Sequence, residues 1–170
     1  MCGSLPCAGW RGPGRATRRE RLHDGYRHDF HQALSEINGG RKRSHWMWYI
    51  FRQIAGLGSS PTAAVYAIRS RAEADAFLQD AILGPAYRHL VGAVREQVVD
   101  RGVTLRQLFG QPDDHKIVSS LTLFAGVAAD LGDEWTTTVV KANEILDRAA
   151  EQGLPRCTAT QCFLADDARP

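Results

Sequence analysis

The sequence has no long apolar run, little net charge and few cysteines, and each shortage excludes a class of protein. No stretch approaches the roughly 18 to 20 apolar residues of a membrane-spanning helix, so we expect no integral membrane protein. The N-terminal residues lack the sustained apolar segment of a secretory signal, which makes the cytoplasm the expected location. The formal net charge is only +2, so charge alone does not predict a polyanion-binding protein.

The four cysteines stand near the ends of the chain, at Cys2, Cys7, Cys157 and Cys162. Without an export signal they are expected to be free thiols rather than a disulfide framework. Their spacing is a poor match to a zinc site, and no histidine pair has metal-ligand spacing, so we predict no metal site. The sequence also lacks a phosphate loop, a dinucleotide-binding fingerprint and a nucleophile elbow, and no cofactor follows from it.

Length and periodicity predict one helical domain between two irregular ends. Residues 1–28 contain Gly, Pro and Arg without a period and are expected to form a disordered tail, and residues 153–170 an irregular C-terminal tail. In residues 29–152 apolar side chains recur at helical spacing, first at Phe30, Ala33 and Ile37. We therefore predict an all-α fold: a single compact multi-helix domain with flexible N- and C-terminal ends.

Capping residues predict where several helices begin. Asp29 is a candidate N-cap for the first helix, and Ser44 for a buried central helix that runs to Gln53. Ser60 precedes a proline at the first helical position, and Ser70 has the spacing of a capping box. Further along, residues 117–127 favour a helix, although residues 118–124 alone are also compatible with a strand.

A family resemblance lies in the most distinctive block of the chain, RKRSHWMWYIFRQIAGLG at residues 41–58. It is followed by YAI, LGP, LFG with PDD and K, and SSLTLF. These motifs resemble those of the DUF1810 proteins, bacterial and fungal domains of unknown function, over residues 30–127. The resemblance implies a small, mostly helical domain without an assigned reaction.

Three cations beside a glycine pair, Arg41, Lys42 and Arg43, suggest an anion site. Guanidinium and ammonium groups next to the amides of a helix start suit a phosphate or carboxylate. A solvated basic turn, with the long side-chain stems packed on tryptophan, explains the same residues. His45 is a candidate acid or base, although a histidine at a helix start is often structural.

Trp46 and Trp48 have rings that can stack on a base or sugar, or that can simply form the core. A second polar group, which includes Asp113, Lys116 and Ser120, falls near one helical face and is expected to meet the 41–48 block in a shared pocket. A helix cap followed by buried hydroxyls is the simpler explanation of that group.

The hypothesis that follows is a binding module for a small anionic ligand, a nucleotide or a phosphorylated metabolite. The predicted ligand-binding residues are Arg41, Lys42, Arg43, Ser44, Trp46, Trp48, Gln53, Lys116, Ser119 and Ser120. One alternative is an enzyme that acts on such a ligand in the same pocket, with His45 or Asp113 as the acid or base. Another is a protein- or nucleic-acid-interaction domain that uses the arginine-rich tail. The sequence does not predict an oligomeric state.

Overall fold

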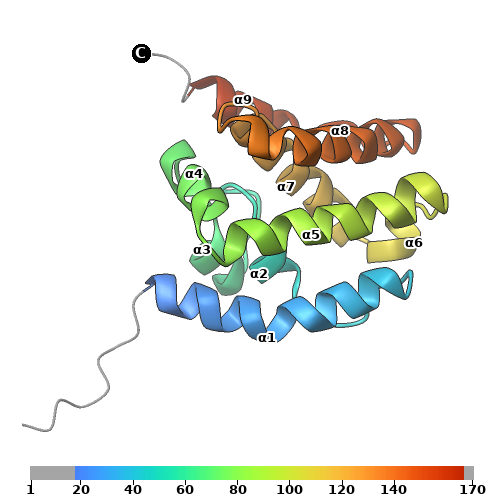
Figure 1. Ribbon diagram of the computed structural model, residues 1–170, viewed down its shortest axis with the longest axis horizontal. Coiled ribbons are helices and arrows are strands. Elements are labelled where there is room, and N and C mark those ends of the chain that lie inside the picture. Colours follow the sequence, from blue (N-terminus) through green and yellow to red (C-terminus); the bar gives the residue numbers. More distant parts are fainter. Residues whose placement is uncertain (1–17, 167–170) are drawn as a thin grey trace, which may run out of the picture.

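The computed structural model describes residues 18–166, which form an all-helical fold (Figure 1). The helices are α1 (Arg18–Asn38), α2 (Met47–Ile50), α3 (Pro61–Tyr66), α4 (Arg71–Gln79), α5 (Leu83–Arg95), α6 (Leu105–Phe109), α7 (Asp113–Ala128), α8 (Thr136–Glu151) and α9 (Thr158–Asp166). A π-helical turn, Glu96–Asp100, continues α5, and a 3-10 turn, Asp133–Trp135, leads into α8. The predicted all-α fold is confirmed.

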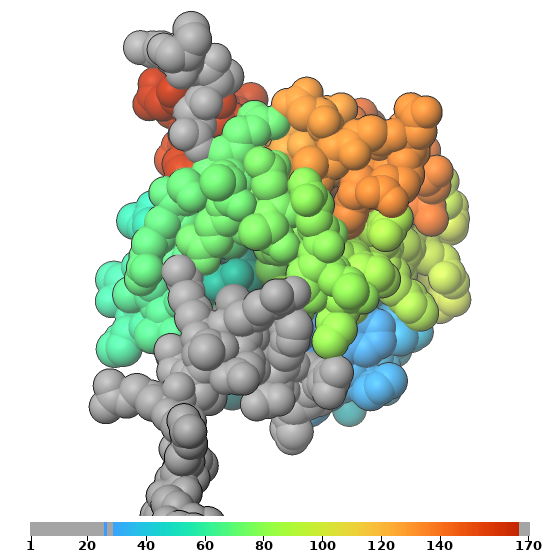
Figure 2. Space-filling view, turned by 60° about the vertical axis from the view of Figure 1, so that its left-hand side comes forward, coloured from blue at the N-terminus to red at the C-terminus, as the bar shows by residue number. Residues whose placement is uncertain are grey.

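The helices pack around α5 and α7. In Figure 1, α5 crosses the middle of the molecule, with α1 on one side and α8 on the other, and α5 packs against both. Helix α7 packs against α4, α6, α8 and α9. Figure 2 shows α4 and the start of α5 (green) on one face, next to α8 (orange). In the described part of the chain, no helix combines the length and apolar character needed to cross a bilayer.

Helix α7 is the most deeply buried element of the core. Every residue from 117 to 125 in it is buried, because neighbouring helices cover it on several sides. The sequence predicted a buried central helix from Trp46 to Gln53. The burial is confirmed at Trp46, Met47, Ile50 and Phe51, but the predicted bounds are wrong, because α2 spans only Met47–Ile50. The residue that follows α2, Phe51, belongs to an aromatic cluster: its ring centroid lies 5.8 Å from that of Tyr87, which lies 4.9 Å from that of Phe124.

The predicted serine caps at Ser60 and Ser70, whose partners lie within one helical turn, are both present. The Ser60 hydroxyl accepts a hydrogen bond from the Ala63 amide at 3.0 Å, and the Ser70 hydroxyl accepts one from the Glu73 amide at 3.2 Å. These two helices therefore begin where the sequence predicts. The segment from residue 113 is a helix, as favoured, rather than a strand.

Helix α1 begins at Arg18, so the predicted start at Asp29 is wrong. Among residues 18–28, Tyr26 is 2% exposed, and its ring stacks on Phe30 at 6.5 Å, one helical turn later. Because charged residues surround Tyr26 in the sequence, the apolar pattern did not reveal that the helix extends to this residue. The expected tail therefore does not reach residue 28, and its residues 1–17 lie outside the described part.

The segment after residue 153 contains a helix, α9, where the sequence analysis expected an irregular tail. Thr160 is fully buried, and Phe163 and Leu164 pack against the core. A Cβ atom added to Gly126 of α7 would lie 2.6 Å from Leu164 Cδ1, so this glycine lets α9 approach α7 closely. Only one short turn of inward residues marks α9, which is too little for periodicity to detect.

Candidate functional site

The Glu36 carboxylate, near the end of α1, fixes the course of the cationic segment. Its Oε2 accepts hydrogen bonds from the Arg43 amide (2.7 Å), the Ser44 amide (3.1 Å) and the Trp46 indole Nε1 (2.8 Å). Its Oε1 accepts one from the Ser44 hydroxyl (2.6 Å). Burial alone raises the pKa of Glu36, but these hydrogen bonds outweigh it and lower the pKa to about 2.

This arrangement corrects the predicted role of Ser44. Its hydroxyl donates to Glu36, and the residue before the first turn of α2 is Trp46, which makes no side-chain cap. In this contact the hydroxyl is the donor, whereas a capping hydroxyl accepts from a helix amide, and α2 begins only at Met47. Ser44 is thus part of the scaffold of the 41–46 segment.

The three consecutive cations diverge rather than forming one cluster. Gly40 has a φ of +74°, and the Lys42 amide donates to the Leu108 carbonyl at 2.6 Å, which directs the Lys42 side chain inward. Arg41 and Arg43 are exposed. Arg41 and Lys42 line an open groove of about 620 Å³ beside α6. Arg43 lines none of the cavities described here.

Asp113 joins the two polar groups that the sequence analysis expected to meet. Its Oδ2 lies 2.6 Å from Lys42 Nζ, and its Oδ1 lies 2.7 Å from Lys116 Nζ. We call these three residues the Lys42–Asp113–Lys116 triad. Burial acts to raise the pKa of Asp113, but the two ammonium groups outweigh it and lower the pKa. One carboxylate between two ammonium groups leaves one positive charge in excess.

Each ammonium group of the triad also lies over a tryptophan ring. Lys42 Nζ is 5.4 Å from the Trp46 ring centroid, and Lys116 Nζ is 4.0 Å from the Trp48 ring centroid. Trp46 is only 1% exposed and is part of the core, so it has no surface for stacking on a ligand. Trp48 is partly buried, and its ring faces two cavities.

The larger of these cavities has a volume of about 450 Å³. We call it the anion pocket, after the ligand that we propose for it below. Its wall comes from α2, the loop between α2 and α3, the first turns of α7 and the segment before α9. The lining residues that carry polar or aromatic groups are Trp48, Gln53, Ser59, Ser60, His115, Lys116, Ser119 and Cys157. Four of the ten predicted ligand-binding residues, Trp48, Gln53, Lys116 and Ser119, are therefore in one pocket.

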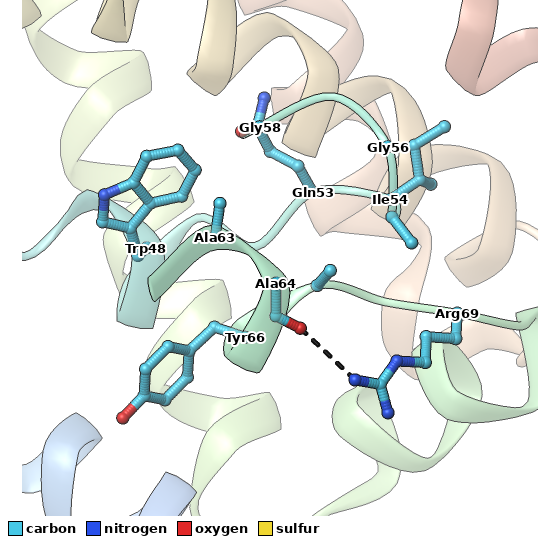
Figure 3. Close-up of a pocket in the computed structure, with 11 residues that line it drawn as sticks. Trp48, Gln53, Ile54, Gly56, Gly58, Ala63, Ala64, Tyr66 and Arg69 are labelled. Carbon is cyan, nitrogen blue, oxygen red and sulfur yellow. Dashed lines mark hydrogen bonds between the residues drawn. The ribbon is translucent and has the colours of Figure 1, made fainter. Parts of the chain in front are cut away.

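A smaller cavity of about 190 Å³, here called the ring cavity, shares Trp48, Gln53 and Gly58 with the anion pocket (Figure 3). Small side chains of α3 form one side of it, among them Ala63 and Ala64. On the other side, the parallel bridge between Ile54 and Ile68 holds the segment after α2 in place.

The predicted residues of the 41–46 segment line neither cavity, and the same holds for Asp113 and Ser120. His45 is exposed and lines neither of them. Ser120 is fully buried, in the core face of α7. Asp113 is held between its two lysines and lines neither cavity. In the described part of the chain, no three His, Cys, Asp or Glu side chains are grouped as metal ligands.

The sequence analysis missed Glu36, His115 and Cys157. No local pattern marks Glu36, because its partners follow across a loop. Cys157 was assigned to an irregular tail, because the inward residues of the helix after it, Thr160, Phe163 and Leu164, are too few to form a recognisable period. Burial raises the pKa of the Cys157 thiol, but hydrogen bonds from the Thr160 hydroxyl and amide, the Ser119 hydroxyl and the Ala159 amide outweigh it and lower the pKa.

The chain matches a known protein family over most of its length. The model of a family described as "Protein of unknown function (DUF1810)" matches residues 17–144. The chain belongs to the DUF1810 family. This DUF1810 protein is also similar to a solved structure, that of the conserved hypothetical protein Rv1873 from Mycobacterium tuberculosis. The two are 36% identical with a TM-score of 0.67, over 85% of this chain and 94% of the other. No curated protein shows a significant match to the chain.

Proposed function

We propose that this protein is a binding module for a small anionic ligand, which occupies the anion pocket beside Trp48. The observation that carries the proposal is the charge of the lining. Lys116 and His115 contribute cationic or protonatable groups, and among the described residues no Asp or Glu lines the pocket. A volume of about 450 Å³ is within the range of about 300 to 1,000 Å³ that is typical of small-molecule sites.

The triad strengthens the attraction for an anion. Its single excess positive charge is partly buried, with side-chain exposures of 9% for Lys42, 14% for Asp113 and 19% for Lys116. Charges in such positions are screened less by salt than charges at the surface. A phosphate or carboxylate in the pocket would compensate the excess charge at Lys116.

The proposed ligand lies away from the exposed arginines, which the sequence-based hypothesis included among its binding residues. Arg41 and Arg43 do not line the anion pocket. The enzyme alternative through His45 or Asp113 has no support from their positions outside the pocket. The interaction-domain alternative depends on the tail, whose residues 1–17 lie outside the described part, and it stays a hypothesis.

The test is a thermal-shift and calorimetric screen of the full chain against nucleotides, sugar phosphates and small carboxylates. A ligand at 100 times its Kd should stabilise the protein by about 2.7 kcal/mol. Lys116→Met keeps an apolar stem over Trp48 but removes the charge, so we expect it to raise Kd at least tenfold. The matched control is Arg41→Ala/Arg43→Ala, which removes two charges outside the pocket and should change Kd less than threefold.

Two outcomes would contradict the proposal. One is a cooperative melt that no anion in the panel shifts. The other is binding that Arg41→Ala/Arg43→Ala abolishes and Lys116→Met leaves intact, which would return the site to the exposed arginines.

A further inference from the structure

Gln53 is a polar group at the boundary between the anion pocket and the ring cavity. Its backbone carbonyl accepts a hydrogen bond from the Ile68 amide at 2.8 Å, which fixes the position of the residue. Its side chain lines both cavities, and Figure 3 shows it projecting from the segment after α2. Within the described residues, its amide makes no hydrogen bond to the protein. Gln53 therefore offers an NH2 donor group and a carbonyl acceptor side by side to a ligand.

The ring cavity has the size and lining of a site for a planar ring. Alanines of α3 and Gly58 keep it open on one side, and Trp48 provides an aromatic wall. Its volume of about 190 Å³ exceeds the roughly 150 Å³ of an apolar cavity that accommodates benzene. The Arg69 guanidinium donates to the Ala64 carbonyl at 3.3 Å, so its position at the rim is fixed.

Gly58 lines both cavities, and its lack of a side chain allows the loop between them to lie close to Trp48 and α3. A Cβ atom at this position would lie 2.6 Å from Ala63 Cβ and 3.1 Å from Trp48 Cη2. Only a residue without a side chain lets the loop pass this near the tryptophan. A ligand with two chemically different parts can therefore place one part on each side of Trp48 and Gln53.

We propose that the ligand is a nucleoside monophosphate, with its base in the ring cavity and its phosphate in the anion pocket. This inference rests on the proposed function, because the phosphate takes the place of the anion near Lys116. The Gln53 amide matches the adjacent donor and acceptor of a nucleobase edge, with which Gln forms bidentate pairs. The single excess charge of the triad suits one phosphate group.

The experiment measures Kd for the full chain by calorimetry with AMP, GMP, CMP and UMP, with ribose 5-phosphate and with the parent nucleosides. We expect at least one nucleotide to bind tenfold or more tightly than both ribose 5-phosphate and its own nucleoside. Gln53→Leu should raise the Kd of that nucleotide at least fivefold and leave the Kd of ribose 5-phosphate unchanged. Ala64→Leu, at an exposed position of α3, should narrow the ring cavity and act in the same way. Gln79→Leu, at an exposed position of α4, is the matched control and should have no effect.

Cys157 provides a second readout of where the nucleotide binds. It lines the anion pocket from the segment before α9, whereas Cys162 in α9 is exposed and outside the pocket. Bound nucleotide should slow iodoacetamide labelling of Cys157 at least threefold, without changing that of Cys162, as followed by peptide mass mapping. Equal labelling of Cys157 with and without a saturating nucleotide would overturn the placement of the phosphate.

The outcomes separate this inference from the proposed function. If ribose 5-phosphate binds as tightly as every nucleotide and Gln53→Leu changes nothing, the nucleotide inference is wrong and the anion site stands. If a nucleoside binds as tightly as its nucleotide and Lys116→Met has no effect, both fail, because the phosphate makes no contribution. If no member of the series binds while a small carboxylate does, only the nucleotide inference is overturned.

Discussion

The indole Nε1 of Trp46 donates a hydrogen bond to the Glu36 carboxylate at 2.8 Å. This contact joins a core aromatic ring to the end of α1 and holds the segment between them in one conformation. Because Lys42 lies within that segment, the position of its ammonium group against Asp113 depends on the same carboxylate. Glu36 thus acts on the charge cluster without lining the anion pocket.

Glu36→Gln should destabilise the protein by about 1 to 3 kcal/mol, because the amide has one acceptor oxygen for donors that now share two. Urea unfolding at neutral pH measures this loss. Glu151→Gln is the control: it removes an exposed partner of Arg148 and should change stability by less than about 0.5 kcal/mol. Equal stabilities of the wild type and Glu36→Gln would contradict the role assigned to Glu36.

The lowered pKa of Glu36 also predicts a pH dependence with a definite sign. The folded-state pKa lies at about 2, below the ordinary value of 4.5, so the ionised form stabilises the fold above about pH 4.5. That stabilisation is lost as the pH falls from about 4.5 towards about 2. Urea unfolding between these limits should give a smaller loss in Glu36→Gln than in the wild type. Parallel curves for the two proteins would refute this prediction.

Asp113→Asn should lower the free energy of unfolding by about 2 kcal/mol, because two partly buried ammonium groups lose their shared counter-charge. Adding Lys116→Met to Asp113→Asn should recover part of that loss, since one of the repelling charges is then gone. A double-mutant cycle by urea unfolding measures the coupling. Strict additivity would show that the triad is not coupled, and Asp147→Asn at an exposed site serves as the control.

Two glycines of α5 should respond to alanine in opposite directions. A Cβ atom on Gly84 would lie 2.0 Å from the backbone oxygen of Leu78, so Gly84→Ala forces the backbone to move and should destabilise by about 2 kcal/mol or more. On Gly92 the nearest atom is Lys141 Nζ at 3.7 Å, so Gly92→Ala should stabilise by about 0.5 to 1 kcal/mol. Thermal melts of both variants test this pair. A stabilising Gly84→Ala would mean that α4 and α5 are not in close contact there.

Cys157 should remain reactive at a lower pH than an ordinary thiol, because hydrogen bonds from Thr160 and Ser119 lower its pKa. The ratio of iodoacetamide labelling rates, Cys157 over Cys162, should therefore rise as the pH falls from about 8 to about 6. Thr160→Val keeps the shape of the buried side chain but removes its hydroxyl, and should flatten this dependence. A ratio that falls with decreasing pH would contradict the hydrogen-bonded thiol.

The parts of the fold that the sequence predicted correctly depend on contacts within one helical turn. Ser60 and Ser70 cap helices through amides three residues away, so their neighbours in the sequence identify them. Helix α7 also followed from its own composition. The start of α1 and the existence of α9 were missed, because a few inward residues among charged or polar neighbours give no clear period.

The part of the candidate site that the sequence predicted is the set of residues that share one face of α7. The expectation that Asp113 and Lys116 meet the 41–48 block agrees with the contact between Asp113 and Lys42. The inward turn of Lys42 depends on Glu36 and on the Leu108 carbonyl, both distant in sequence. The walls of the two cavities come from segments that are distant in the sequence. No local sequence pattern predicts that these segments lie side by side.

The family model ends at residue 144, yet Pro155 and Cys157 form part of the anion-pocket wall. Trp48 and Lys116 thus lie inside the region that the family model matches, and the last two lining residues lie beyond it. If the pocket binds the proposed ligand, an exchange of the segment before α9 would alter part of the wall and leave Trp48 and Lys116 in place.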